Sequence, residues 1–149
     1  MKVVIQRVQH AEVTVNGDMV GKIGQGMLIL HGVEVGDTDD DLQYILKKTL
    51  QLRIFDDANG VMNESILQQR GDVLCVSQFT LLANTKKGNR PSYISAAPPE
   101  ISHPMYDKFC QLLQENLGKT VQRGIFGADM KVALLNDGPV TIIIDSRNR

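Results

Sequence analysis

Strand patterns outnumber helical patterns in this chain, and the two kinds do not alternate along it. Several short runs are rich in β-branched and apolar residues or alternate between apolar and polar residues. They are Lys2–Val8, Ala11–Val15, Met19–Ile23, Met27–Leu30, Leu52–Phe55, Val73–Val76, Val132–Leu135 and Val140–Ile144. Because this order lacks the β–α–β repeat of a parallel sheet, it predicts an α+β fold with an antiparallel sheet that helices curl or close.

Two segments have the spacing of an amphipathic helix. The first follows Asp37–Asp41. Capping residues and carboxylates are favourable at the positive end of a helix dipole, so this acidic run predicts a helix start rather than a metal site. The second begins near Pro104 and is expected to stop at Gly118. The apolar stripes are Leu42, Ile45, Leu46, Thr49 and Leu50 in the first segment, and Tyr106, Phe109, Cys110, Leu113 and Leu117 in the second.

The chain has 149 residues, the length of one domain, and we expect residues 1–149 to share one core. No apolar run approaches the ~20 residues of a membrane span and no leader pattern is found, so a cytoplasmic protein without a membrane partner is expected. Cys75 and Cys110 lack CxxC spacing and a nearby His cluster, so they are predicted to be reduced core residues. No pattern indicates a metal or another cofactor.

The charge of the chain is balanced, with 16 basic and 17 acidic residues and a net charge of −1. This balance argues against a protein that coats nucleic acid through a general positive field, so any contact with RNA must be local. The best local candidate is the basic segment formed by Lys86, Lys87 and Arg90. A solvated loop without a partner is the alternative.

Polar residues follow directly after the apolar run Val73–Val76. Ser77, Gln78 and Thr80 follow this run without an intervening loop residue, and they surround Phe79. Polar groups at the end of a buried strand need hydrogen-bond partners or a ligand. These four residues are therefore the candidate catalytic residues. The alternative is that their side chains bond only to neighbouring backbone.

A second polar stretch, Asn136–Thr141, lies between the last two apolar runs. Its Asn-Asp-Gly-Pro sequence is turn chemistry, and we predict that it connects the two strands of a hairpin. The bond between Gly138 and Pro139 is a candidate for the cis form, which only ~5–6% of bonds before proline adopt in folded proteins.

At these two stretches the sequence resembles the D-aminoacyl-tRNA deacylase family. The resemblance rests on motifs that occur in the family's order across the chain: Ile5–Val8, Ser77–Leu81, Gly88–Tyr93, Gly124–Met130 and Asn136–Thr141. Tyr93 and Gly127 depart from the family's usual Phe and Ala. The resemblance implies a barrel-like β core with about two helices packed outside it, and a homodimer that acts on the 3′ end of aminoacylated tRNA.

The resemblance also implies hydrolysis of the ester bond in D-aminoacyl-tRNA and in mischarged glycyl-tRNA. Members of the family are thought to use the 2′-hydroxyl of the terminal ribose, so Thr80 is expected to position the substrate rather than attack it. Backbone N–H groups around Phe79 and Thr80 would bind the developing oxyanion. The Gly138–Pro139 dipeptide of one subunit would enter the other subunit's site and exclude L side chains.

Supporting roles are expected for residues outside these two stretches. Arg7 would hold the dipeptide through charge-assisted hydrogen bonds to backbone carbonyls, with a surface arginine as the alternative. Phe126 and Met130 would line the adenosine end of the site, with a plain core role as the alternative. The basic segment would contact the acceptor stem of the tRNA.

Two other classes of function stay open. A conventional serine or threonine esterase or amidase of small molecules would use Ser77 or Thr80 as its nucleophile. However, His10, His31 and His103 show no link in sequence to either residue, and no G-x-S-x-G elbow is present. A nucleic-acid binding module without catalysis would use the basic segment alone.

Overall fold

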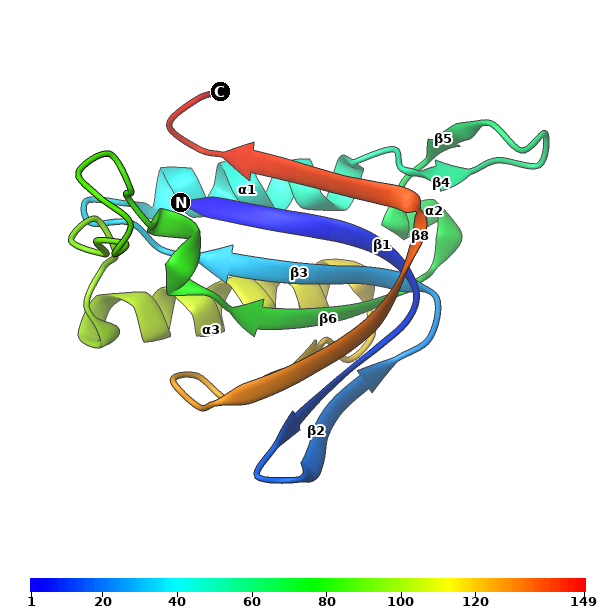
Figure 1. Cartoon of the computed structure of the whole chain (residues 1–149). Coiled ribbons are helices and arrows are strands. Elements are labelled where there is room, and N and C mark those ends of the chain that lie inside the picture. The colour runs from blue at the N-terminus through cyan, green and yellow to red at the C-terminus, as the bar shows by residue number, and fades with distance from the viewer.

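A six-stranded mixed sheet lies at the centre of the computed structural model, which describes residues 1–149 (Figure 1). Its strands are β1 (Lys2–Val15), β2 (Asp18–Ile23), β3 (Gly26–Gly32), β6 (Asp72–Ser77), β7 (Gln122–Arg123) and β8 (Met130–Asp145). The strand order is β2-β1-β3-β6-β7, and β8 pairs with the other edge of β1. A separate two-stranded ribbon consists of β4 (Phe55–Asp56) and β5 (Met62–Glu64).

The long strand β1 belongs to two parts of the sheet. Its first half pairs with β3, its second half pairs with β2, and β8 runs antiparallel beside both halves. The two runs predicted at Lys2–Val8 and Ala11–Val15 are thus one strand. β2 curls back toward β7, so that a Cβ atom on Gly21 would lie 3.0 Å from the carbonyl oxygen of Arg123. The sheet is therefore nearly closed into a barrel.

The predicted α+β class and barrel-like core are confirmed, and the sheet is mixed. β1 pairs antiparallel with β2, β3 and β8, whereas β3 and β6 are parallel, as are β6 and β7. The parallel pair arises because the chain leaves β3, crosses over through a helix and returns in the same direction. The polar end of β6 is thereby placed beside the end of β3, with Ser77 opposite His31.

The helices are α1 (Asp39–Gln51), α2 (Ile66–Gln69) and α3 (Pro99–Leu117), and α1 and α3 cover one face of the sheet (Figure 1). In α1, Thr38 is the N-cap residue and forms a capping box with Asp41. Every residue of the apolar stripe predicted for α1 is buried. No helix combines the length and the apolar character that crossing a membrane requires.

The helix α3 begins at Pro99, earlier than the predicted start near Pro104. Proline is tolerated in the first turn of a helix because the N–H group that it lacks would have no partner there. Pro98 is the N-cap residue, so Pro98 and Pro99 open the helix while Pro104 lies inside it. The predicted stop at Gly118 is confirmed, since this residue has φ of 65° and its N–H group donates to the carbonyl of Gln114.

The hairpin predicted at Asn136–Pro139 is wrong, because β8 continues through this stretch. Gln6 of β1 pairs with Thr141, and Val8 pairs with Asn136. β8 therefore carries extra residues between two points of one antiparallel ladder. The stretch is a bulge within a single strand, and the turn residues make the bulge rather than a reversal of the chain.

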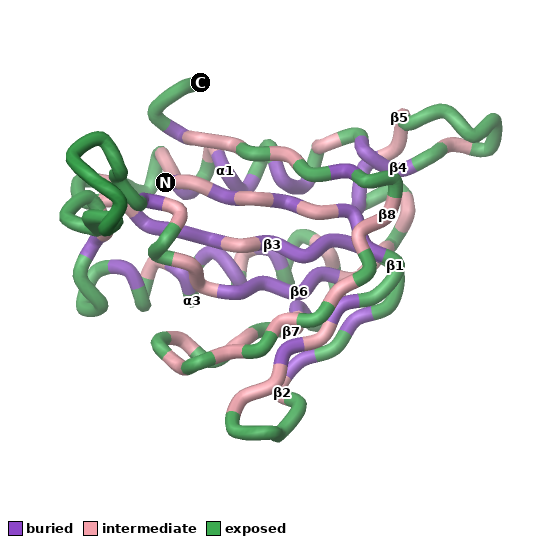
Figure 2. Tube along the Cα trace, viewed as in Figure 1, coloured by how far each residue is buried: buried purple, intermediate pink, exposed green.

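Two apolar clusters hold the elements together. The larger cluster has 22 buried residues from the sheet and the helices, and Phe55 and Phe109 are among its largest side chains. The smaller cluster has 7 buried residues from β1, β2, β3 and β6, including Val13 and Leu74, and it fills the inside of the curled sheet. Buried residues concentrate in β1, β3 and β6, and the connecting loops are exposed (Figure 2). The end of β6 is therefore where the buried sheet meets solvent.

Candidate active site

A cavity of about 580 Å³ opens at the end of β6. It is bounded by the end of this strand, the start of α3 and the segment 126–130 that leads into β8. Five of the residues predicted for the site lie on its wall, namely Ser77, Gln78, Phe79, Phe126 and Met130. A concave and largely apolar pocket with a few polar groups is the usual form of a small-ligand site.

The predicted catalytic stretch forms the junction between a strand and a 3₁₀ helix. β6 ends at Ser77, and the backbone N–H group of Gln78 then donates to the carbonyl of His31 at 2.8 Å. The 3₁₀ helix η1 (Phe79–Leu82) follows directly. The first N–H groups of a helix have no acceptor within the helix, so two backbone donors are available to a ligand at this junction.

Thr80 lies beside the cavity rather than on its wall, and its side chain is exposed. Its hydroxyl oxygen accepts a hydrogen bond from the side-chain amide of Gln78. An amide donor does not remove a proton, so this contact does not activate the hydroxyl as a nucleophile. The contact instead fixes the two side chains relative to each other.

The fold brings His31 next to Ser77, a link that the sequence did not reveal. The His31 ring is buried, its Nε2 atom lies 3.3 Å from the sulfur of Met1, and its Nδ1 atom has no hydrogen-bond partner. Burial lowers the pKa of His31 to about 3, so the ring is neutral at physiological pH. Neither ring nitrogen is bonded to Ser77 or Thr80, so His31 does not complete a nucleophile and base pair with either hydroxyl.

Aromatic side chains form two sides of the cavity. The rings of Phe79 and Tyr93 meet edge to face with their centroids 5.0 Å apart, and the ring of Phe126 stacks on His103 at 4.3 Å. Phe79 is 57% exposed, whereas large apolar side chains are usually buried. Exposed rings at the mouth of a pocket offer a flat apolar surface to a ligand or to another chain.

The helix side of the cavity includes Tyr106, whose hydroxyl donates to the carbonyl of Cys75 at 2.8 Å. Burial raises the pKa of Tyr106, so the phenol stays a neutral donor. Cys75 and Cys110 are buried free thiols, as predicted. Burial also raises the pKa of Cys75, which keeps this thiol protonated and inert.

Gly138 and Pro139 do not lie on the cavity of their own chain. They are exposed at the bulge in β8, and the peptide bond between them is cis. Arg7 is buried beside them, where its Nε atom donates to the carbonyl of Asp137 at 3.3 Å and its Nη1 atom donates to the carbonyl of Ile54 at 2.7 Å. Arg7 is therefore not a surface arginine, because its exposed fraction is only 7%.

Further contacts hold the bulge from below. The Arg7 guanidinium lies 3.2 Å from a carboxylate oxygen of Asp56 and 3.3 Å from one of Asp137. The side-chain amide of Asn136 spans the base of the bulge and donates to the carbonyls of Arg7 and Val140, at 3.0 and 2.9 Å. Charge-assisted and neutral hydrogen bonds therefore act together on the backbone of the bulge.

The basic segment lies in an exposed loop that follows η1. The loop is closed by two backbone hydrogen bonds between Asn84 and Ser92, at 2.8 and 2.9 Å. Lys86, Lys87 and Arg90 are all exposed. The next residue after the loop, Tyr93, lies on the cavity wall, so the basic segment is joined to the cavity through the chain.

Within one chain, the predicted site residues thus fall into three groups: the cavity with Ser77, Gln78, Phe79, Phe126, Met130 and the adjacent Thr80; the bulge with Arg7, Gly138 and Pro139; and the loop with Lys86, Lys87 and Arg90. Other cavity residues were not predicted for the site, among them His31, Ser102 and Tyr106. The only sequence signal for them was a polar atom on an otherwise apolar strand or helix face, and that signal does not separate a pocket from a core.

Comparison with known proteins identifies the family of this chain. A family model described as D-Tyr-tRNA(Tyr) deacylase matches residues 4–145. The D-aminoacyl-tRNA deacylase of Parabacteroides distasonis is 58% identical over 149 residues, which cover 100% of this chain and 99% of that protein. A D-aminoacyl-tRNA deacylase of Bacteroides fragilis is 60% identical over the same shares of both chains.

Two solved structures have a similar fold over nearly the whole chain. A structure described as a c-Myc DNA unwinding element binding protein has a TM-score of 0.93 and 39% sequence identity, covering 97% of this chain and 98% of that one. A probable eukaryotic D-amino acid tRNA deacylase has a TM-score of 0.82 over 96% of this chain and 97% of that one, and at 19% identity it supports the fold alone. The family match spans nearly the whole chain, and this chain belongs to the D-Tyr-tRNA(Tyr) deacylase family, a family of hydrolases.

Proposed function

We propose that this chain hydrolyses the ester bond of D-aminoacyl-tRNA, and of mischarged glycyl-tRNA, and so releases free tRNA and the amino acid in the cytoplasm. Residues 1–149 would act as a single deacylase domain. The observation that carries the proposal is the polar end of β6 on the wall of a cavity, in a chain 58% identical over its whole length to a protein named D-aminoacyl-tRNA deacylase.

The reaction needs no protein nucleophile, because the substrate carries its own reactive group. An ester on the 3′-oxygen of the terminal ribose has a free 2′-hydroxyl beside it, which relays a proton from the attacking water to the leaving oxygen. Water adds to the carbonyl carbon, and the bond from that carbon to the 3′-oxygen breaks. The hydroxyl of Thr80 accepts a hydrogen bond from an amide, which favours a positioning role over attack.

Backbone donors at the start of η1 would stabilise the negative charge that develops on the carbonyl oxygen. The N–H groups of Phe79 and Thr80 have no acceptor within the short helix. One well-placed donor of this kind contributes on the order of 10²–10³ in rate. Ser77 and Gln78 would orient the ester against these donors, since both lie on the cavity wall.

Chiral selection is the harder demand, because D and L residues carry the same atoms and differ only in the direction of the side chain. Discrimination of ~10⁴ corresponds to about 5.5 kcal/mol, which steric exclusion by a rigid backbone supplies. The bulge at Gly138 and Pro139 is such a backbone, because Arg7 and Asn136 hydrogen bond to it. Its carbonyls would exclude an L side chain and capture the substrate's amino group. Glycine has no side chain to exclude, so glycyl-tRNA would also be hydrolysed.

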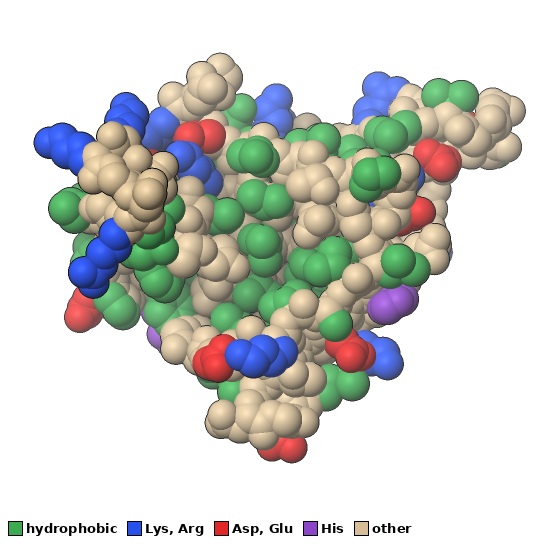
Figure 3. Space-filling view, in the orientation of Figure 1, with side chains coloured by type: hydrophobic (Ala, Val, Ile, Leu, Met, Phe, Trp, Pro, Cys, Tyr) green, Lys and Arg blue, Asp and Glu red, His purple; other side chains and the backbone are tan.

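The bulge would reach the site through a homodimer in which each subunit inserts its dipeptide into the partner's cavity. Gly138 and Pro139 are exposed and lie off the cavity of their own chain. β8 pairs only with β1, and its side chains Leu135 and Ile143 are 47% and 71% exposed. Apolar side chains also lie on the face of the sheet turned away from the helices (Figure 3). Such an edge and face favour a second chain over solvent.

Phe126 and Met130 would line the part of the cavity that takes the terminal adenosine. Both lie on the cavity wall, and Phe126 is stacked on His103, which fixes the plane of its ring. A nucleobase stacks on an aromatic ring with a contribution of roughly 1–3 kcal/mol. This placement would leave the ester between the adenosine and the backbone donors of η1.

Replacing Lys86, Lys87 and Arg90 together by alanine is expected to weaken tRNA binding without changing the preference for D over L. Each lost phosphate contact should lower the slope of log affinity against log salt by roughly one, because fewer counterions are released. Binding of D-Tyr-tRNA across a range of salt concentrations measures both quantities. Alanine at Lys22, Lys47 and Lys48, which are exposed on other surfaces, is the matched control. Unchanged affinity in the first variant would remove the basic segment from the interface.

Deacylation of D-Tyr-tRNA, L-Tyr-tRNA and glycyl-tRNA by the purified chain tests the proposed function. Hydrolysis of the D and glycyl substrates with little hydrolysis of the L substrate is the expected result, and equal rates on D and L would contradict it. Hydrolysis of a small ester without ribose that is lost in Thr80→Ala would indicate a conventional esterase instead. The likeness to a DNA-binding protein of known structure makes a binding module the second candidate, and tRNA binding without any deacylation would favour it.

A further inference from the structure

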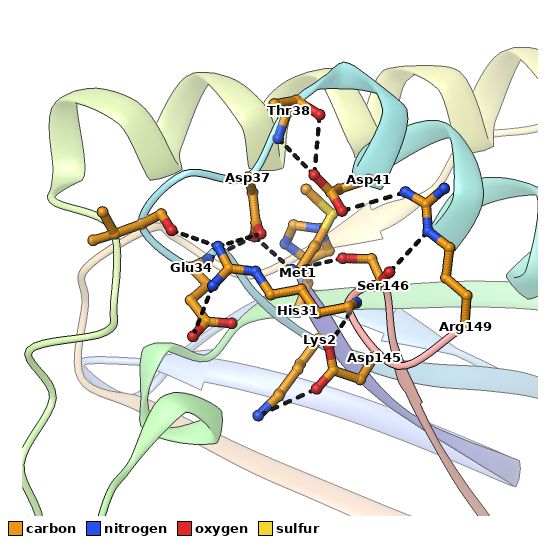
Figure 4. Close-up of polar contacts among 12 residues, drawn as sticks. Met1, Lys2, His31, Glu34, Asp37, Thr38, Asp41, Asp145, Ser146 and Arg149 are labelled. Atoms are coloured by element: carbon orange, nitrogen blue, oxygen red, sulfur yellow. Dashed lines mark hydrogen bonds and ion pairs between the residues drawn. The ribbon is translucent and has the colours of Figure 1, made fainter.

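The amino group of Met1 is buried inside a polar cluster of side chains (Figure 4). Its nitrogen lies 2.6 Å from a carboxylate oxygen of Asp37, and both side chains are fully buried. The same nitrogen donates to the hydroxyl of Ser146 at 2.9 Å, and the backbone N–H group of Ser146 donates to the Met1 carbonyl at 2.9 Å. The charged amine thus has defined partners on two sides.

Asp37 joins this amine to two other segments of the chain. One of its oxygens also accepts the backbone N–H group of Glu34 at 2.7 Å, within the turn between β3 and α1. Its other oxygen accepts a hydrogen bond from Arg147, in the tail after β8, at 3.3 Å. Arg147 reaches Glu34 as well, at 3.3 Å. One carboxylate therefore holds the first residue, the turn and the tail together.

Two short paths lead from this cluster to the cavity. The sulfur of Met1 lies 3.3 Å from Nε2 of His31, and the backbone carbonyl of His31 accepts the N–H group of Gln78 at 2.8 Å. On the other side, the turn that Asp37 holds begins at Val33, whose carbonyl accepts the N–H group of Ala97 at 2.9 Å. His31, Gln78 and Ala97 all lie on the cavity wall.

We propose that Met1 carries a modification-sensitive site, and that the deacylase reaches its active form only when the α-amino group of this residue is free. An acyl group, such as the formyl group on new bacterial chains, converts the ammonium to a neutral amide. The maturation step is hydrolysis: water adds to the formyl carbon, the bond from carbon to nitrogen breaks, formate leaves, and the amine takes up a proton. A residue joined before Met1 would act as the formyl group does.

The physical reason is the loss of a buried charge pair. Without the ammonium, the carboxylate of Asp37 keeps only Arg147 as a charged partner, at 3.3 Å, and the formyl atoms must enter a site with no exposed surface. Removing one partner of a buried pair destabilises strongly, because the remaining charge stays buried without compensation. The turn at Val33 and the ring of His31 would then lose their fixed positions against the cavity.

The test compares the chain with a free amine and the formylated chain, which is obtained by expression with a deformylase inhibitor and verified by intact mass. Formylation is expected to lower the melting temperature by roughly 10 °C. It should also reduce kcat/KM for D-Tyr-tRNA at least tenfold at a temperature where circular dichroism shows both forms folded. In Asp37→Asn the effect should vanish or reverse, because the formyl group then neutralises an ammonium that has lost its counter-ion.

A matched control and a second modified chain keep the outcome clear. Lys22→Gln, which breaks an exposed pair with Glu12, should leave the effect of formylation as it is in the wild type. A chain with one glycine before Met1 should also show a lower melting temperature and a lower kcat/KM than the chain with a free Met1 amine. This second chain provides the comparison if the formylated chain does not fold. Equal melting temperatures of the free and formylated chains, or an undiminished effect in Asp37→Asn, would overturn the proposal. The comparison of melting temperatures does not depend on the proposed deacylase reaction. A chain with no deacylase activity at all would therefore count against the proposed deacylase function and not against the role of the Met1 amine.

Discussion

Gly138→Ala is expected to lower the deacylation rate of D-Tyr-tRNA by about 10²-fold and to weaken the preference for D over L, because small displacements at a reacting centre have effects of this size. Gly138 has φ of 121°, a conformation that alanine rarely adopts. A Cβ atom there would lie 2.8 Å from Cγ2 of Val140 and 3.1 Å from Nη2 of Arg7. Since both neighbours hold the bulge, the carbonyls that select the substrate must move.

The measurement is the ratio of kcat/KM for D-Tyr-tRNA and L-Tyr-tRNA in wild type and variant, with the melting temperature recorded beside it. Gly24→Ala is the matched control, because a Cβ atom on Gly24 would meet only a carboxylate oxygen of Asp72, at 4.0 Å. Wild-type rates and selectivity in Gly138→Ala would mean that the bulge does not select the substrate.

A tRNA that ends in 2′-deoxyadenosine and carries D-tyrosine on its 3′-oxygen is expected to be hydrolysed about 10³-fold more slowly than the natural substrate. General acid and base catalysis contributes roughly 10²–10⁴ in rate, and in this chain the relay is assigned to the substrate. Thr80→Ala should be far milder, about tenfold, because the hydroxyl of Thr80 only accepts a hydrogen bond from Gln78.

Single-turnover rates with the two substrates separate the chemical step from binding. A tRNA with 2′-deoxyribose at the penultimate nucleotide is the control, because it loses a hydroxyl that is not next to the ester. Unchanged hydrolysis of the terminal deoxy substrate, together with an inactive Thr80→Ala, would reverse the assignment and make Thr80 the attacking group.

Local patterns were enough to predict the elements whose shape depends on neighbours in sequence. The stripe from Leu42 to Leu50 matched α1 because a helix places every third or fourth residue on one face. The run Val73–Val76 matched the buried strand β6, because a short apolar run between polar residues is typical of a strand that is buried on both faces. In each of these cases, the deciding interactions lie within a few residues.

The errors have a common physical cause, which is that long-range pairing overrides local turn chemistry. Asn136–Pro139 has the composition of a hairpin loop, but pairing of both flanks with the bent strand β1 makes it a bulge. Proline is common in the first turn of a helix, so the pattern predicts a helix start near Pro104, yet the turns on either side keep this residue inside α3.

The candidate site was predictable only in part, because its groups meet through the fold. Ser77 to Thr80 stood out as polar residues after a buried run, and the structure places them at a cavity. His31 did not stand out, since its approach to Ser77 depends on the parallel register of β3 and β6. The position of the amine of Met1 beside Asp37 is likewise a product of the folded chain, in which the strand start and a turn come together.

The central claim is that two copies of the chain share each site, one giving the cavity and the other giving the bulge. The most direct test uses two variants that are each expected to retain about a hundredth or less of the wild-type activity on D-Tyr-tRNA. They are Gly138→Ala with a damaged bulge and Ala128→Trp with a filled cavity, since Ala128 lies on the cavity wall. In a purified heterodimer, the intact cavity of the first meets the intact bulge of the second, so about half of the wild-type activity per dimer should return. A heterodimer as inactive as its parents, or a fully active monomer, would contradict the claim.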